Sequence, residues 1–131
     1  MPTPNVTSST PVLYVERIEP VFSFWERLGF EKTSTVPEGD HAGFAILSNG
    51  KVEVMYQTFD SLKKDAPALL EAARAGRTFL YLHVEHLAAI KAAVADLTVY
   101  LPERKTFYGA TELGVREPGG HYVAFAEFAP A

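Results

Sequence analysis

The sequence contains one hydrophobic pattern twice. Residues 13–30 read LYVERIEPVFSFWERLGF and residues 82–97 read LHVEHLAAIKAAVADL, so that Val15 aligns with Val84 about half a chain length later. Each copy has the pattern of a hydrophobic strand, a short polar turn and an amphipathic helix. A repeated unit of this kind predicts two similar halves that pack together and enclose a cavity.

Both halves are predicted to follow the order β-α-β-β-β. The first helix opens with Pro20 in its first turn and ends at Gly29. Its buried stripe consists of Val21, Phe24, Trp25 and Leu28. Asn49-Gly50 supplies a tight turn between two strands. The expected strands cover 12–16, 30–36, 44–47, 51–57, 79–84, 98–101, 112–116 and 122–128, with a loop at 37–43 and a second helix at 88–96.

The predicted organisation is one domain of the α+β class. It consists of a disordered tail at 1–9, a first βαβββ module at 10–58, a linker helix at 59–77 and a second βαβββ module at 78–131.

Composition excludes several classes of protein. The net charge of −4 argues against nucleic-acid binding, and the absence of cysteine excludes a disulfide framework and a thiol nucleophile. No apolar run is long enough to span a bilayer, and the first ten residues lack the features of a signal peptide. A cytoplasmic protein without membrane or nucleic-acid partners is expected.

Three motifs resemble the vicinal oxygen chelate superfamily, which includes glyoxalase I, extradiol dioxygenases and bleomycin-resistance proteins. VERIEPVFSFWERLGF at 15–30 is similar to the opening motif of that family, YGATE at 108–112 to the W-G-x-x-E motif of its bleomycin-resistance branch, and EPGGHY at 117–122 to a family turn. The sequence departs from the pattern at Arg17 and His86, where Asp is usual. The resemblance implies two βαβββ modules that form a curved mixed sheet around a cavity.

The resemblance also implies where a metal would bind. Enzymes of the family hold a divalent ion through His, Glu, His and Glu, and the corresponding positions here are Thr10, Glu53, Phe79 and Ala124. Phe and Ala have no donor atom and Thr is a poor ligand, so one carboxylate remains. We therefore expect no metal and no other cofactor, with His83 as the residue that would most readily restore a ligand.

Strand alternation identifies the side chains that face the cavity. They are Thr10, Val12, Tyr14, Lys51, Glu53, Met55, Gln57, Phe79, Tyr81, His83, Tyr122, Ala124 and Ala126, whereas Leu13 and Val15 pack on the helix. The predicted ligand-binding residues are Tyr14, Glu53, Met55, Phe79, Tyr81, His83, Glu112 and Tyr122, an aromatic set with few polar groups.

Structural explanations compete with these assignments. Glu53 either binds a cationic ligand, or pairs with Lys51 or an arginine of a second copy, or simply faces solvent. His83 serves either as a proton carrier or as an ordinary hydrogen-bonding partner, and Glu112 either binds ligand or forms a salt bridge on an edge strand. Arg104 and Lys105 are expected to be a solvated charge pair in a loop, and His41 and His121 are expected at the surface.

Two functions follow from the resemblance. The preferred one is a small-molecule-binding protein that sequesters an aromatic or cationic ligand without a metal, as in antibiotic resistance, with sites in grooves between the subunits of a homodimer. The alternative is a lyase, isomerase or dioxygenase of the same superfamily, either dependent on a metal or with Glu53 as a base. A regulatory module with a vestigial cavity is a third possibility. The sequence leaves open whether the two modules pair within one chain or between chains.

Overall fold

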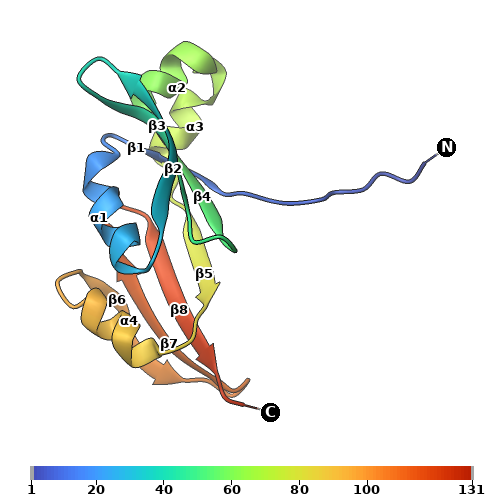
Figure 1. Ribbon diagram of the computed structural model, residues 1–131, viewed down its shortest axis with the longest axis vertical. Helices are drawn as coiled ribbons and strands as arrows, with labels where there is room; N and C mark the ends of the chain where they lie inside the picture. The colour runs from blue at the N-terminus through green and yellow to red at the C-terminus, as the bar shows by residue number, and fades with distance from the viewer. Residues whose placement is uncertain (1, 131) are drawn as a thin grey trace.

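A computed structural model describes residues 2–130, and its elements follow the predicted order (Figure 1). Met1 of the predicted tail and Ala131 of the second module lie outside this range. The first module contains β1 (Val12–Val15), α1 (Glu19–Arg27), β2 (Glu31–Glu38), β3 (His41–Ser48) and β4 (Glu53–Thr58). The connection contains α2 (Phe59–Asp65), η1 (Pro67–Leu69) and α3 (Leu70–Ala75). The second module contains β5 (Phe79–His83), α4 (Leu87–Ala93), β6 (Val99–Lys105), β7 (Ala110–Arg116) and β8 (Tyr122–Phe128).

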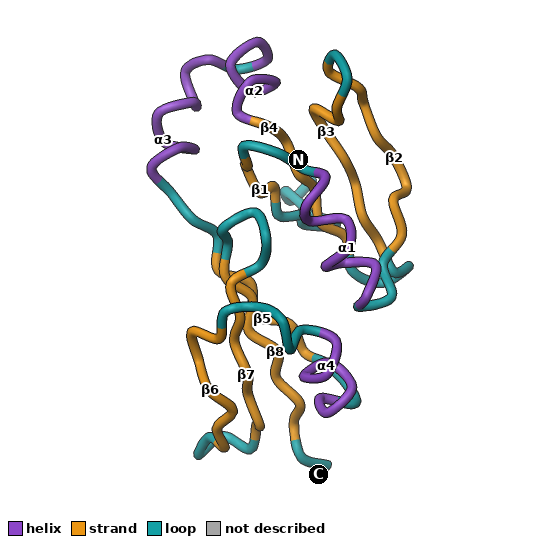
Figure 2. Tube along the Cα trace, turned by 90° about the vertical axis from the view of Figure 1, so that its left-hand side faces the viewer, coloured by secondary structure: helices purple, strands orange, loops and turns teal. Residues whose placement is uncertain are grey.

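Each module forms its own four-stranded mixed sheet. The strand orders are β1-β4-β3-β2 and β5-β8-β7-β6, and the first strand of each module lies parallel to the last. The α+β class and the two βαβββ modules are therefore confirmed. Within one chain the strands form two separate open sheets, one above the other along the long axis of the molecule (Figure 2).

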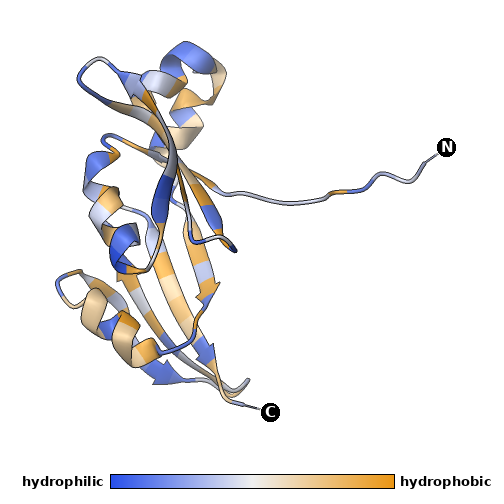
Figure 3. Ribbon diagram, viewed as in Figure 1, coloured by the Kyte–Doolittle hydropathy of each residue, from blue (hydrophilic) through white to orange (hydrophobic). Residues whose placement is uncertain are grey.

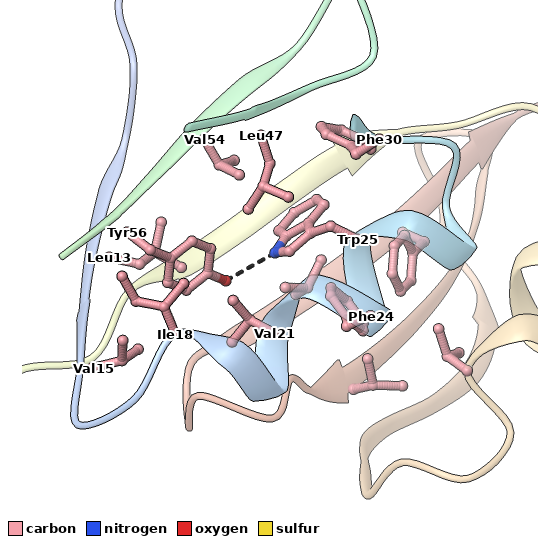
Figure 4. Packing of buried hydrophobic residues seen from close by; sticks show 14 of the residues in the cluster. Leu13, Val15, Ile18, Val21, Phe24, Trp25, Phe30, Leu47, Val54 and Tyr56 are labelled. Carbon is pink, nitrogen blue, oxygen red and sulfur yellow. Dashed lines mark hydrogen bonds between the residues drawn. The ribbon is translucent and has the colours of Figure 1, made fainter. Parts of the chain in front are cut away.

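Helix α1 joins the two modules through its apolar stripe. Val21, Phe24 and Trp25 are fully buried, and Gly29 ends the helical segment with a φ of +88°, a conformation that glycine adopts at low cost. The same hydrophobic core contains Leu47 and Val54 of the first sheet (Figure 4). It also contains residues of the second sheet, namely Leu113, Val115, Val123 and Phe125. The helix-facing sides of both sheets thus share one core.

Buried hydrogen bonds also cross between the modules. Trp25 Nε1 donates to the Tyr56 hydroxyl at 2.9 Å (Figure 4), and that hydroxyl donates to a Glu117 carboxylate oxygen at 2.6 Å. The His121 ring accepts from the Thr78 N–H at Nδ1 and contacts the Tyr14 carbonyl oxygen at 2.8 Å through Nε2. His121 is only 3% exposed, so its expected surface position was wrong. It follows the glycine turn and folds back between the modules.

Three segments differ from the sequence-based expectation. The predicted loop at 37–43 is a tight hairpin turn at Gly39-Asp40, because β2 and β3 both extend into it. The predicted linker helix is interrupted before Pro67, whose ring disfavours helical backbone at the preceding residue. Residues 102–105 continue strand β6, so Arg104 and Lys105 belong to a strand and not to a loop. Residues 2–9 form no helix or strand and are exposed (Figure 1).

Candidate functional site

The second sheet has one face buried against the helices and one open face. Along β8, Val123 and Phe125 point into the core, whereas Tyr122 and Phe128 point to the open face. Hydrophobic residues run along β5 and β8 (Figure 3), and Phe79 of β5 is 70% exposed. Exposed apolar faces of this kind are candidates for binding surfaces. We call it the aromatic face, and it consists of Phe79, Tyr81, His83, Tyr100, Tyr108, Tyr122 and Phe128.

The rings of the aromatic face pack on one another in an ordered array. Phe79 stacks on Tyr122, with ring centroids 5.0 Å apart and planes 10° apart, because register pairs the two residues across β5 and β8. Tyr100 meets the edge of Tyr122 at 5.0 Å. His83 stacks on Phe128 at 4.9 Å. These contacts hold the rings in place before any ligand arrives, which lowers the entropy lost on binding.

Small residues form the floor beneath these rings. Ala124 and Ala126 of β8 lie beside Gly114 and Glu112 of β7. A Cβ on Gly114 would lie 2.7 Å from Tyr100 Cζ, so only glycine lets the Tyr100 ring lie on the sheet. The face is therefore flat enough for its rings to lie close to the strands.

Glu112 is buried at the centre of this face, with 1% exposure. Its carboxylate accepts hydrogen bonds from the Tyr81 and Tyr108 hydroxyls at 2.5 Å each, and Arg104 Nε donates at 3.1 Å. The register of β6 and β7 places Arg104 directly opposite Glu112. Because β7 is an interior strand, the expected edge-strand position of Glu112 was wrong.

These contacts set the protonation of the cluster. The hydrogen bond from the Tyr108 hydroxyl, followed by those from Tyr81 and Arg104, lowers the pKa of Glu112 below its usual range. The hydrogen bond to Glu112 raises the pKa of Tyr81 well above its ordinary value. At neutral pH the cluster therefore contains the Glu112 carboxylate, the neutral Tyr81 phenol and the Arg104 guanidinium, so that the carboxylate and guanidinium charges balance.

The remaining predicted site residues lie on the first sheet. Val12 pairs with Met55 and Tyr14 with Gln57, so that the register keeps this group on one sheet. Glu53 is exposed and accepts a hydrogen bond from the Thr10 hydroxyl at 3.2 Å. The eight predicted residues thus form two groups in one chain. Phe79, Tyr81, His83, Glu112 and Tyr122 share the second sheet, and Tyr14, Glu53 and Met55 share the first.

A groove of about 590 Å³ lies where the modules meet. The β3–β4 turn contributes Lys51, and Tyr81 and His83 of the edge strand β5 line it as well. Lys51 precedes β4, because the Asn49 side chain accepts from the Lys51 and Val52 amides and holds a longer turn than the sequence predicted. Two of the residues of the aromatic face therefore also border a groove shared by both modules.

The donor atoms at the family's metal positions do not fit a divalent ion. Thr10 lies just before β1 and contacts Glu53 at the start of β4, whereas Phe79 and Ala124 lie on neighbouring strands of the second sheet. Within residues 2–130, no three His, Cys, Asp or Glu side chains converge to hold a metal ion. A divalent ion needs several converging N or O donors. The side chains at these four positions therefore do not support a metal-dependent reaction step.

Sequence reasoning missed several residues of the aromatic face. Tyr100, Tyr108 and Phe128 were not predicted as ligand-binding residues, and Arg104 was placed in a loop. The signal for Tyr108 was present in the YGATE motif, because a turn at Gly109 (φ +92°) folds residue 108 back toward residue 112. Tyr100 had no such signal, since its position depends on the bulged pairing of β6 with β7.

Comparison with solved structures places this fold among known proteins. A glyoxalase/bleomycin resistance protein/dioxygenase from Nocardioides superposes with a TM-score of 0.73 at 16% identity, covering 99% of this chain and 88% of that one. Lactoylglutathione lyase from Agrobacterium tumefaciens superposes with a TM-score of 0.72 at 15% sequence identity, and the match covers 95% of each chain. The bleomycin-binding protein from Streptomyces verticillus, complexed with copper(II)-bleomycin, superposes with a TM-score of 0.62 at 21% sequence identity. The match covers 98% of this chain and 100% of that one. No protein-family model and no curated protein sequence matches the chain.

The chain is thus a two-module α+β protein with open four-stranded sheets. The same fold occurs in a glyoxalase/bleomycin resistance protein/dioxygenase, a lactoylglutathione lyase and a bleomycin-binding protein, and it is the fold that the sequence motifs predicted. Because a lyase and a bleomycin-binding protein both share it, the fold alone does not choose between catalysis and binding. No helix within residues 2–130 has the length and apolar character needed to cross a membrane.

Proposed function

We propose that this protein binds a small aromatic or cationic molecule on its aromatic face, without a metal, and sequesters it. The observation that carries the proposal is an ordered array of exposed rings around a charge-neutral cluster at Glu112. Such a face offers apolar area at roughly 25 cal/mol per Å² buried, and ring faces that attract cations. A cytoplasmic location would suit such a role.

A second copy of the chain completes the site in this proposal. Phe79 and Tyr81 remain 70% and 45% exposed in one chain. The first-sheet group with Tyr14, Glu53 and Met55 lies on a different sheet of the same chain. A homodimer that sets the first sheet of one copy over the aromatic face of the other would place Glu53 near the rings. Glu53 would then supply the negative charge for a cationic ligand.

Bleomycin is a suitable probe, since two of the similar structures are bleomycin-binding proteins in complex with it or its copper form. Isothermal titration calorimetry should show binding that weakens by at least about tenfold in Tyr81→Ala and Glu53→Ala. Glu26→Ala, which removes an exposed carboxylate from α1, should bind like the wild type. A ligand that binds all four proteins equally would remove the aromatic face as the site.

Metal content separates binding from the enzymatic alternative. Protein purified without a nickel column should contain a negligible fraction of a divalent ion by elemental analysis. A stoichiometric ion that survives dialysis would contradict metal-free sequestration and would favour a lyase, isomerase or dioxygenase. A thermal-shift screen of dicarbonyl compounds would then test that alternative.

A further inference from the structure

We infer that this chain has a second binding site, for a small organic anion with an apolar body, formed by Arg77, Arg116 and the apolar pocket between β1 and α3. The site lies at the Gly119-Gly120 turn, where the two modules meet. The inference does not rest on the proposed function, although Arg116 lies over Tyr122 of the aromatic face and Tyr14 also lines the pocket.

Two guanidinium groups converge at this turn. A point beside Gly120, where a Cβ would sit, is 3.4 Å from Arg116 Nη2 and 3.8 Å from Arg77 Nε. Arg77 approaches from the segment before β5, and Arg116 from the end of β7. Both distances from this point are short enough for one anionic group placed there to contact Arg77 and Arg116 together.

Backbone carbonyl oxygens orient both arginines without neutralising them. Arg77 Nη1 donates to the Gly76 carbonyl oxygen at 2.7 Å and to that of Arg74 at 3.4 Å. Arg116 Nε lies 3.5 Å from the Gly120 carbonyl oxygen, and its guanidinium lies over the Tyr122 ring at 5.8 Å. These contacts fix the two groups in position and leave the Arg77 Nε free of hydrogen bonds among the described residues.

Neither arginine has an acidic partner within residues 2–130. The salt bridges of the described chain involve other cations. Glu117 is the nearest buried carboxylate by sequence, and its oxygens already accept from the Tyr56 hydroxyl and the His121 amide. Two exposed arginines without a counter-ion among residues 2–130 offer a local positive charge that one anion from solution can contact, even though the chain has a net charge of −4.

An apolar pocket opens beside Arg77. Its volume is about 270 Å³, and Val12, Leu69 and Ala73 form its apolar wall, with Thr78 and His121 at the same pocket. The volume suits one ring or a short alkyl chain. Arg77 lines this pocket and Arg116 lies near it at the Gly120 turn, so the two arginines would select for a carboxylate or phosphate on that group. The ligand class is therefore an aromatic or short-chain carboxylate or phosphate monoester.

Phenyl phosphate, inorganic phosphate and phenol form a matched set of probes for calorimetry. Phenyl phosphate should bind the wild-type protein at least about tenfold more tightly than inorganic phosphate, and phenol should show no measurable binding. Arg77→Gln and Arg116→Gln should each weaken phenyl phosphate binding about tenfold or more, while Lys63→Gln on α2 has no effect. Ala73→Leu should narrow the pocket and weaken phenyl phosphate binding without changing that of inorganic phosphate.

Tyr81→Ala distinguishes this site from the aromatic face. It should leave phenyl phosphate binding unchanged even if it removes the proposed ligand of that face. No binding of phenyl phosphate to the wild type, or binding in both arginine variants as tight as in the wild type, would overturn the inference. Equal affinities for phenyl and inorganic phosphate, unaffected by Ala73→Leu, would also overturn it, because they would reveal attraction by surface charge alone.

Discussion

Glu112 shows how one residue organises an exposed face. A buried carboxylate is costly unless donors surround it, and here two phenol hydroxyls and one guanidinium do so. The same hydrogen bonds fix the rings of Tyr81 and Tyr108 at defined positions. The Glu112 carboxylate therefore positions the rings of Tyr81 and Tyr108, and the Arg104 guanidinium balances its negative charge.

The stabilisation that Glu112 provides should depend on pH. Its pKa is lowered from the ordinary value of 4.5 by the hydrogen bond from the Tyr108 hydroxyl and those from Tyr81 and Arg104, so the folded state favours the carboxylate. Stability from this group is fully present above about pH 4.5 and is lost as pH falls through the folded-state pKa. Urea unfolding of wild type and Glu112→Gln should differ at pH 7, and the difference should shrink below pH 4. A constant difference across this range would contradict the assigned contacts.

In the hydrophobic core, the Tyr56 hydroxyl likewise connects several side chains, because it accepts a hydrogen bond from Trp25 and donates one to Glu117. Burial, followed by the Glu117 charge, raises its pKa well above the usual value, so the hydroxyl stays protonated and donates to Glu117. Tyr56→Phe removes both the acceptor for Trp25 and a donor to a buried carboxylate. We expect a loss of about 1–3 kcal/mol in the free energy of unfolding, measured with urea. Tyr100→Phe is the control, and a comparable loss there would show that the Tyr56 hydroxyl is not special.

At the level of elements, the Gly119 turn governs how closely the modules approach. A Cβ on Gly119 would lie 2.7 Å from Val15 Cγ1 at the end of β1 and 3.0 Å from the Glu117 carboxylate oxygens. Both neighbours are buried and cannot move freely. Close packing of this turn on β1, which is far away in the sequence, therefore requires glycine at position 119.

Gly119→Ala should destabilise the protein by about 1–3 kcal/mol, because the added methyl group forces the turn away from β1. The measurement is a double-mutant cycle with Val15→Ala, in which loss of Cγ1 makes room for the new methyl group. The double variant should be less destabilised than the sum of the two single variants. Strict additivity would show that the contact with Val15 is not the cause.

The two open sheets dominate the properties of the whole molecule. Their helix-facing sides share one core through α1, and rings of the aromatic face such as Phe79 stay exposed to solvent in the described part of the chain. We therefore expect a homodimer in solution, with a mass by light scattering of about twice the 14.4 kDa of one chain. Phe79→Asp, which puts a charge on the most exposed ring of β5, should shift the protein toward the monomer. A wild-type protein that is monomeric at high concentration would contradict this expectation.

Periodicity and turn chemistry in the sequence predicted much of this molecule. The stripe with Phe24 and Trp25 and the alternation along β5 and β8 depend on residues close in the chain, so local patterns identify their buried and exposed sides. The same alternation correctly separated Leu13 and Val15 from the side chains on the other face. Element ends were less accurate: hydrogen-bonded pairing extended β2, β3 and β6 beyond the segments that their residue types indicate.

By itself, the sequence determined the two βαβββ modules and the apolar face of their helices. Only the tertiary structure decided that His121 lies between the modules, that Glu112 holds Tyr81, Tyr108 and Arg104 together, and that Arg77 meets Arg116. The physical reason is that these contacts join residues brought together by the register of one sheet or by the docking of one module on the other. The conformational preferences of short sequence segments determine neither the register of the sheet nor the docking of the modules.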